Sequence, residues 1–367
     1  MKLLSFQPCS LYQNGGCGRV LRRLYAGKEE DVFSISVNAA HNKVNTGKIK
    51  EEQLALFPQQ QKWMRWKLRN INGYLQSKFM ASLNRQHIQN IVQNYSCDVI
   101  HTVNHGAYSA SLCMPELIKG KQLWVSFHDH YSLCSSFSDC EMLWETADRR
   151  LVISAELGNR YIQEFGKKDF EIITDGLLEN EIASPRQTTS QPIIIYFGGL
   201  LHYDYLPLFR VLANALDAMI LKHGFAFKFI IRGAANIRFL NDRLFEVEYR
   251  NDFISDEAIG KELNEAAILY LPIKFNNPAF YLYSLSTKMI GYLGAAGKIL
   301  YHGPADSAAY RLLCDSSSAI LCTTLDEVDL YKALESAICE SDQISENAKL
   351  LAQQQFYLSC IQSEFWK

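Results

Sequence analysis

The stretch Tyr281–Gly303, YLYSLSTKMIGYLGAAGKILYHG, predicts a loop, a short helix, a glycine stop and then a buried strand. Ser284, Ser286 and Thr287 stand where this helix should begin, and serine and threonine are good N-cap residues. The next residue, Lys288, would place a cation at the positive end of the helix dipole. A lysine beside free backbone N–H groups suits a phosphate or another anion, and the alternative is an ordinary crossover helix with a solvated lysine.

Short apolar runs recur on both sides of this stretch and predict buried parallel strands, because a sheet covered on both faces needs nearly continuous apolar strands. Amphipathic segments such as 206–224 and 256–267 lie between the runs and predict helices. Strand–helix–strand alternation of this kind indicates an α/β fold with right-handed crossovers. The runs are 2–6, 31–37, 98–103, 123–128, 150–154 and 170–174, followed by 192–198, 227–233, 244–249, 267–272, 298–302 and 319–323.

A polar segment with two prolines, ENEIASPRQTTSQP (179–192), separates the two series of strands. We therefore expect an N-terminal doubly wound domain over 1–182 and a C-terminal one over 190–340. The remaining segment, 341–367, is predicted to be helical and to pack across the domain junction. Two facing domains of this type form a cleft at the carboxyl ends of their strands, where ligands of open α/β sheets bind.

The bulk composition excludes several classes of protein. The chain has 367 residues, of which 48% are hydrophobic and 21% charged, and its net charge of −2 argues against a dedicated nucleic-acid binder. Its ten cysteines form no CxxC pair and indicate reduced thiols in a cytoplasmic protein. The N-terminal MKLLSFQPCS is too short for a signal peptide, which counts against a periplasmic binding protein. No run approaches the roughly 20 apolar residues of a membrane span.

Glycines follow the first strand of the N-terminal domain. Gly15 and Gly16 precede a predicted helix, so they suit either the close approach of a ligand or a plain tight turn.

Histidines follow two later strands of the same domain. His128 and His130 flank Asp129, but residues two apart on an extended chain point in opposite directions, so no metal site is expected. His128 could instead donate a hydrogen bond to a sugar hydroxyl. His101 and His105 end the preceding strand, and for each a structural hydrogen bond is the alternative.

Glycine or cationic residues also follow several strands of the C-terminal domain. Arg232 closes a strongly apolar run, so it needs an anion, which is either an Asp or Glu side chain or a diphosphate. The residues at these strand ends are Gly198, Gly199, Arg232, Gly233, Asp252, Phe253, Pro272 and the helix start Ser286–Lys288.

These motifs together resemble the retaining glycosyltransferases of the GT-B fold, close to the large family 4, over nearly the whole chain. The strongest similarity lies in ADRRLVISAELGNRYIQEFGKKDFEIITDGL (147–177) and in STKMIGYLGAAGKIL (286–300), which is similar to the donor-site helix of that family. Further similar segments are NGGCGRVLRRLYAG (14–27), DVIHTVNH (98–105), SFHDHYSLC (126–134), PIIIYFGGLL (192–201) and FISDEAIGKELNEAAILYLP (253–272).

The chain departs from the family at two places. Many members carry two glutamates eight positions apart, but the loop IKFNNPAFYLYS (273–284) has no acid, and Gly291 or Tyr292 occupies the place of the second glutamate, which normally holds the donor ribose. The arginine and lysine expected after the first strand of the donor domain are also absent from GGLLHYDY (198–205), where His202 is the remaining candidate.

The resemblance implies a hexosyltransferase-type enzyme of class EC 2.4 that moves a sugar from a UDP- or GDP-sugar to a saccharide or lipid-linked acceptor, with retention and without a metal or cofactor. It assigns the donor diphosphate to helix N–H groups and fixed cations and His128 to a hydrogen bond with the donor sugar. It places the acceptor in the N-terminal domain. It also implies a role in bacterial surface polysaccharide synthesis. The donor residues it implies are Gly198, Gly199, Arg232, Phe253, Ser286, Thr287 and Lys288, and the acceptor or cleft residues are Gly15, Gly16, His105 and Asp129.

Two alternatives to this enzyme stay open. The missing glutamates favour a nucleotide- or sugar-binding subunit that has lost catalysis. A sugar-nucleotide 2-epimerase would share the fold, but it needs several cleft carboxylates, and the acid-poor loop 273–285 counts against it.

The segment KWMRWKLRNINGYLQSKFMASLNRQ (62–86) interleaves basic residues with tryptophans. This pattern suits a peripheral contact with an anionic membrane at the inner face of the cell membrane. The alternative is a solvated amphipathic helix whose tryptophans face the core.

Overall fold

The computed structural model describes residues 1–12, 15–37, 47–57, 71, 75–104, 107–186, 191–199, 201, 203–234, 236–252, 254–339 and 342–367. The chain divides into two compact units. The first contains Met1–Thr174 together with Gln362–Lys367, and the second contains Asp175–Ile361.

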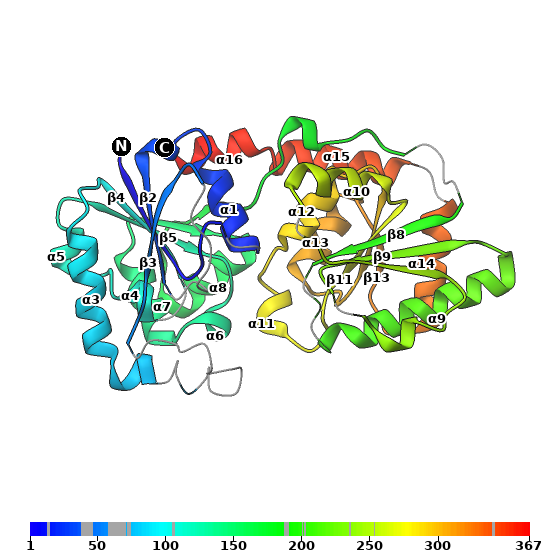
Figure 1. Ribbon diagram of the computed structural model, residues 1–367, viewed down its shortest axis with the longest axis horizontal. Helices are drawn as coiled ribbons and strands as arrows, with labels where there is room; N and C mark the ends of the chain where they lie inside the picture. The colour runs from blue at the N-terminus through cyan, green and yellow to red at the C-terminus, as the bar shows by residue number, and fades with distance from the viewer. Residues whose placement is uncertain are drawn as a thin grey trace. The chain divides into compact units, whose positions relative to one another are not determined.

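A 7-stranded parallel sheet forms the centre of the first unit, in the order β3-β2-β1-β4-β5-β6-β7 (Figure 1). The inner strands β1, β4 and β5 are almost wholly buried, as their apolar sequences require. The strands are β1 (Leu3–Gln7), β2 (Val32–Val37), β3 (Lys50–Leu54), β4 (Val99–Val103), β5 (Gln122–Phe127), β6 (Arg149–Val152) and β7 (Glu171–Ile172).

The helices of the first unit begin at recognisable caps. Ser136 and Ser154 accept hydrogen bonds from the backbone of α7 and α8, and α8 ends at Gly166, whose φ of 96° favours glycine. The helices are α1 (Gly16–Tyr25), α3 (Ala81–Gln93), α4 (Ala107–Ala110), α5 (Pro115–Ile118), α6 (Tyr131–Cys134), α7 (Phe137–Thr146) and α8 (Ala155–Phe165).

The second unit contains a 6-stranded parallel sheet in the order β10-β9-β8-β11-β12-β13. Its strands are β8 (Ile193–Gly198), β9 (Phe227–Arg232), β10 (Glu246–Arg250), β11 (Ile268–Pro272), β12 (Lys298–His302) and β13 (Ile320–Cys322). Its helices are α9 (Leu206–His223), α10 (Asp256–Glu265), α11 (Pro278–Tyr281), α12 (Thr287–Gly294), α13 (Ala308–Asp315), α14 (Glu327–Cys339) and α15 (Gln343–Gln355), followed by α16 (Leu358–Phe365), whose last residues belong to the first unit.

Both faces of the second sheet are covered, and each face has its own apolar core. Side chains of α9 and α14 pack on one face, against Ile195 and Phe229. Helices α10, α12 and α15 cover the other face (Figure 1). Their side chains pack there against Ile230 and Leu269. The alternation of Ile195 with Tyr196 along β8 supplies one residue to each core, which is why the strand is apolar throughout.

The expected α/β architecture with two doubly wound sheets is confirmed, and each predicted apolar run overlaps a strand. Among the described residues, one strand was not predicted. Strand β3 reads KEEQL and pairs with β2 at the edge of the first sheet, where only one neighbour is needed and polar side chains reach solvent. An apolar-run criterion does not detect such an edge strand.

The C-terminal segment is helical over its described part, and its last residues pack within the first unit. Phe365 lies against Tyr25, His101 and Trp124 at ring-centroid distances of 5.9, 5.1 and 5.3 Å. Arg149 donates hydrogen bonds to the carbonyls of Phe365 and Glu364 at 2.7 and 2.9 Å. All ten cysteines carry free thiols. No helix in the described part of the chain has the length and apolarity to cross a membrane.

A chain of buried polar side chains connects three strands of the first sheet to α1. The Tyr25 hydroxyl lies 2.7 Å from Ser5 Oγ and 2.6 Å from His101 Nδ1, and His101 Nε2 lies 2.7 Å from Ser126 Oγ. Burial lowers the pKa of His101 to about 3, so the ring is neutral. Of the two roles open for His101, the structure gives it the structural hydrogen bond.

We expect Tyr25→Phe to lower the free energy of unfolding by about 1–3 kcal/mol, because it removes the buried partner of His101 Nδ1 and one of the two hydrogen-bond partners of Ser5 Oγ. Urea unfolding measures this loss. Tyr331→Phe is the matched control, since the Tyr331 hydroxyl lies 2.7 Å from His223 Nε2 at an exposed position. That control should change the stability by less than about 0.5 kcal/mol. If Tyr25→Phe and Tyr331→Phe lower the free energy of unfolding equally, burial of the Tyr25 hydroxyl is not the cause of the loss.

Candidate functional site

The candidate site of the second unit lies where β8, β9 and β11 end and α12 begins. Parallel strands bring their carboxyl ends to one edge of a sheet, and the crossover loops leave from that edge.

Helix α12 begins where the sequence predicts. Ser286 has extended backbone angles (φ −76°, ψ 131°), and its hydroxyl accepts a hydrogen bond from the backbone N–H of Lys288 at 3.2 Å. Thr287 is the first helical residue. Met289 and Ile290 are fully buried and hold the first turn against the sheet. The position of Lys288 is therefore set by the cap and by the buried face of the helix.

The Lys288 ammonium group lies on an aromatic ring. Its Nζ is 4.0 Å from the centroid of Phe197, near the end of β8, and 5.7 Å from that of Tyr205. Among the described residues no carboxylate pairs with it, and burial lowers its pKa to about 7. A ring face attracts a cation but does not neutralise it, so an anion would be stabilised here.

Gly199 makes room for this lysine. A Cβ at position 199 would lie 3.0 Å from Lys288 Cε and 3.2 Å from Nζ, and the φ of 139° at Gly199 also favours glycine. The backbone N–H of Gly198 donates to the Tyr292 hydroxyl at 3.0 Å, and that of Gly199 donates to the Arg232 carbonyl at 3.0 Å. Both amides, which the resemblance assigns to the diphosphate, are thus engaged within the fold. What these glycines contribute is the absence of side chains.

The two candidates for the position of the missing glutamate differ in environment. Tyr292 is buried, and its hydroxyl holds the end of β8 through Gly198. A Cβ at Gly291 would meet nothing within 4 Å. Gly291 follows Lys288 by three positions, so the two lie on neighbouring parts of the helix surface. Gly291 is therefore the place where a longer side chain would fit.

Arg232 has an acidic partner. Its Nε and Nη2 donate to the two carboxylate oxygens of Glu262 at 2.7 and 2.6 Å, and Nη1 donates to the Asp252 carbonyl at 2.7 Å. Arg250 Nη1 also lies 3.1 Å from Glu262. Burial acts to raise the pKa of Glu262, but the hydrogen bonds and charges of the two arginines outweigh it and lower that pKa. Of the two anions proposed for Arg232, the structure contains the carboxylate.

Lys274, in the loop after β11, was not predicted as a site residue from the sequence. Its Nζ lies 5.0 Å from the centroid of Tyr205 and 3.3 Å from Asp204 Oδ2, and Asn276 Nδ2 lies 3.3 Å from Asp204 Oδ1. The rule that singled out Arg232, a cation directly after an apolar strand, would also have found Lys274.

In the first unit, His128 follows β5 directly and is partly buried. Burial lowers its pKa, against the opposing charge of Asp129. The Asp129 carbonyl accepts a hydrogen bond from the Tyr161 hydroxyl at 3.1 Å. His130 caps α6 and lies with Nε2 3.7 Å from Glu164. Within the described ranges, no group of three or more His, Cys, Asp and Glu side chains could hold a metal ion.

Gly15 precedes α1 with a φ of 145° and open space at its Cβ position, and Gly16 is the first residue of that helix. Several predicted positions lie outside the described residues. These are His105, Phe253, His202 and, in the basic segment 62–86, residues 62–70 and 72–74.

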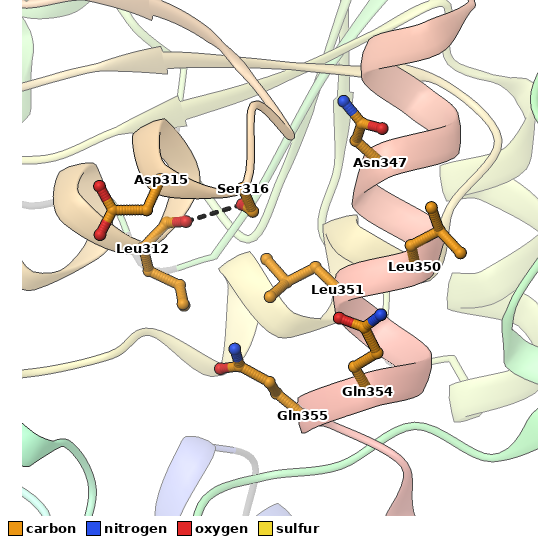
Figure 2. A pocket seen from close by; sticks show the side chains of 8 residues that line it. All are labelled: Leu312, Asp315, Ser316, Asn347, Leu350, Leu351, Gln354 and Gln355. Atoms are coloured by element: carbon orange, nitrogen blue, oxygen red, sulfur yellow. Dashed lines mark hydrogen bonds between the residues drawn. The ribbon is translucent and has the colours of Figure 1, made fainter.

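One cavity of the second unit, of about 410 Å³, lies away from all these residues, between α13 and α15 (Figure 2). Asp315 is the charged residue that lines it, so it offers no cation to a diphosphate. The other lining residues are Leu312, Ser316, Asn347, Leu350, Leu351, Gln354 and Gln355. We therefore place the candidate site at Lys288.

No protein-family model and no curated protein sequence matches the chain. Solved structures do match it in fold. HepE (Alr3699) of Anabaena in complex with UDP has a TM-score of 0.69 at 12% identity, and the match covers 100% of this chain and 98% of that one. A glycosyltransferase of Rickettsia africae ESF-5 has a TM-score of 0.70 at 13% identity, with 100% and 97% covered.

An α,α-trehalose-phosphate synthase (UDP-forming) of Burkholderia vietnamiensis has a TM-score of 0.66 at 10% identity, with 100% and 99% covered. HepE has also been solved with UDP-glucose, at a TM-score of 0.68 and 12% identity over 100% of this chain and 98% of that one. At such low identity these similarities establish the fold. The chain has the two-domain α/β fold of the GT-B glycosyltransferases.

Proposed function

We propose that this protein is a glycosyltransferase that moves a sugar from a nucleoside-diphosphate sugar to an acceptor. The observation that carries the proposal is the Lys288 ammonium group at the start of α12, partly buried and without a carboxylate partner among the described residues. HepE, which shares the fold, binds UDP and UDP-glucose. We extend this to a UDP-sugar as the donor here, with a GDP-sugar as the alternative.

The chemistry of such a transfer needs stabilisation of the leaving group. Breaking the bond at the anomeric carbon leaves a nucleoside diphosphate with additional negative charge. Lys288 and the N–H groups of the first turn of α12 meet that charge without reorganisation, because the cap at Ser286 and the packing of α12 already fix them. A cation without an acidic partner gains most from the charge that develops.

The finer features of the reaction extend the same proposal. We infer that the transfer proceeds with retention and without a metal ion, since lysine and helix N–H groups supply the positive charge. A leaving phosphate oxygen takes the acceptor proton, so no enzymic base is required. His128 contacts the donor sugar, and Gly15, Gly16, His105 and Asp129 lie at the acceptor. The acceptor is a saccharide or a lipid-linked saccharide used in the synthesis of a surface polysaccharide. The enzyme acts from the cytoplasmic side, and the segment 62–86 makes a peripheral contact with the membrane.

One observation favours a second function. Gly291 and Tyr292 leave α12 without the glutamate that holds the donor ribose in the family that the chain resembles. A subunit that binds the nucleotide without transferring sugar would have the same helix. The two functions differ in turnover, which is measured as UDP released from UDP-glucose in the presence of saccharide acceptors.

We expect the protein to bind UDP and Lys288→Ala to weaken that binding by about tenfold to a hundredfold, since a charge-assisted hydrogen bond contributes about 1.5–3 kcal/mol. Isothermal titration calorimetry measures both affinities. Lys222→Ala is the matched control, because Lys222 Nζ also lies on a tyrosine ring, 5.1 Å from the centroid of Tyr331 on α14. Absence of UDP binding, or equal affinity in Lys288→Ala and the wild type, would show that the donor site is wrongly placed.

We expect UDP affinity to fall as the pH rises above 7. The pKa of Lys288 in the free protein is lowered to about 7, and a bound phosphate favours the protonated form and raises this pKa. Binding then takes up a proton, so the affinity decreases by up to about tenfold for each pH unit above 7 until the pH reaches the pKa of the complex. Calorimetry at pH 6.5, 7.5 and 8.5 tests this.

Lys288→Arg should remove the pH dependence while retaining binding, because arginine stays charged throughout this range. A slope that persists in Lys288→Arg would assign the titration to another group.

We expect Gly291→Glu to raise UDP affinity by about tenfold, because the open position beside Lys288 can place a carboxylate on the ribose hydroxyls. Gly260→Glu controls for the gain in helix propensity, since Gly260 lies in α10 and also has open space at its Cβ position. If both variants bind UDP as the wild type does, Gly291 is not the position that faces the ribose.

A further inference from the structure

A second ammonium group shares the aromatic ring beside Lys288. Lys274 Nζ lies 5.0 Å from the Tyr205 centroid, and Lys288 Nζ lies 5.7 Å from the same centroid. These two distances together limit how far apart the ammonium groups can be. A hydrogen bond between an ammonium group and a phosphate oxygen spans about 2.8 Å at each end, so two linked phosphoryl groups are long enough to reach both lysines.

Lys274 reaches the ring from a loop whose base is fixed. Ile273, directly before it, is buried, and its backbone N–H donates to the His302 carbonyl at 2.8 Å. The Lys274 side chain is 14% exposed, which is low for a lysine and shows that its stem is covered. The ammonium group is therefore held beside Tyr205 by the loop as well as by its own contacts.

The Asp204 carboxylate pairs with Lys274 but stays partly in solvent. The distance from Lys274 Nζ to Asp204 Oδ2 is 3.3 Å, and the Asp204 side chain is 49% exposed. A pair with one partner in solvent is weak, so the ammonium group can turn to a phosphate at little loss. Arg232 differs, because Glu262 binds it with two hydrogen bonds and is itself only 14% exposed.

The negative charge of a diphosphate also exceeds the positive charge that Lys288 supplies, so a second cation is expected. Lys288 supplies one positive charge, whereas a diphosphate carries more than one negative charge at neutral pH. The loop 198–205 that follows β8 contains no lysine or arginine, and its one acid is Asp204. Lys274 enters from β11, which pairs with β8 in the sheet.

We propose that Lys274 is the second cation for the donor diphosphate, held over Tyr205 by Asp204 until the donor binds. This inference rests on the proposed function, because it concerns the same donor site. It implies that the substrate is a nucleoside diphosphate derivative and not a nucleoside monophosphate derivative. Two lysines beside one ring can bind a second phosphoryl group as well as the first.

The test compares UDP with UMP by calorimetry in the wild type, Lys274→Ala, Lys274→Arg, Asp204→Asn and Lys222→Ala. We expect Lys274→Ala to reduce the ratio of UDP to UMP affinity by about tenfold and Lys274→Arg to restore it to within about threefold. Asp204→Asn should keep or raise UDP affinity, because it releases the lysine. Lys222→Ala should leave the ratio unchanged.

A purely structural role for Lys274 gives a different pattern. Breaking the pair from either side would then weaken UDP binding equally, so a matching loss in Asp204→Asn and Lys274→Ala overturns the inference. An unchanged ratio in Lys274→Ala also overturns it. If Lys288→Ala weakens UDP binding while Lys274→Ala does not, the proposed function stands and this inference alone fails. A wild type that binds no UDP overturns both.

Discussion

A lysine ammonium group that lies on a phenylalanine ring, rather than beside a carboxylate, is the interaction on which the candidate site depends. Burial without an acid makes the charged form of Lys288 less stable, as its lowered pKa of about 7 shows. The surroundings contain what this arrangement requires. Phe197 offers a ring face, Gly199 has no side chain to collide with the lysine, and Ser286 caps the helix that carries it. An anion bound there would relieve the unfavourable charge.

The other end of α12 shows the opposite use of a lysine. Lys349 of α15 is buried and donates hydrogen bonds to the carbonyls of Leu293, at 3.1 Å, and of Ala295. A cation at the carboxyl end of a helix is favoured by the dipole and satisfies carbonyls that have no helical partner. Gly294 also packs closely, since a Cβ there would lie 2.6 Å from the Glu181 carbonyl oxygen. Lys349 thus stabilises the carboxyl end of α12. Lys288 lies at the amino end, where the helix dipole disfavours a cation.

Features that depend on residues close in the sequence could be predicted from it. The apolar runs located the strands, and the serines before Lys288 located the start of α12, because burial and capping leave local patterns. Contacts between distant residues could not be predicted in the same way. The partner of Arg232 is Glu262 on α10, and the partner of the Gly198 amide is the Tyr292 hydroxyl. Both follow from how the crossover helices pack on the sheet.

Within the proposed function, a glycine at 291 in place of a ribose-binding glutamate would affect donor binding more than the chemical step. A ribose contact is made equally in the ground state and the transition state, so its absence raises KM and leaves kcat unchanged. In the proposed reaction the charge on the diphosphate, in contrast, grows as the glycosidic bond breaks, so lysines at that end would act mainly in the transition state. An enzyme with Lys288 in place and no glutamate at 291 therefore retains the part of the site that accelerates transfer. The missing glutamate argues for a weakly held donor, and it does not by itself argue for a lost reaction.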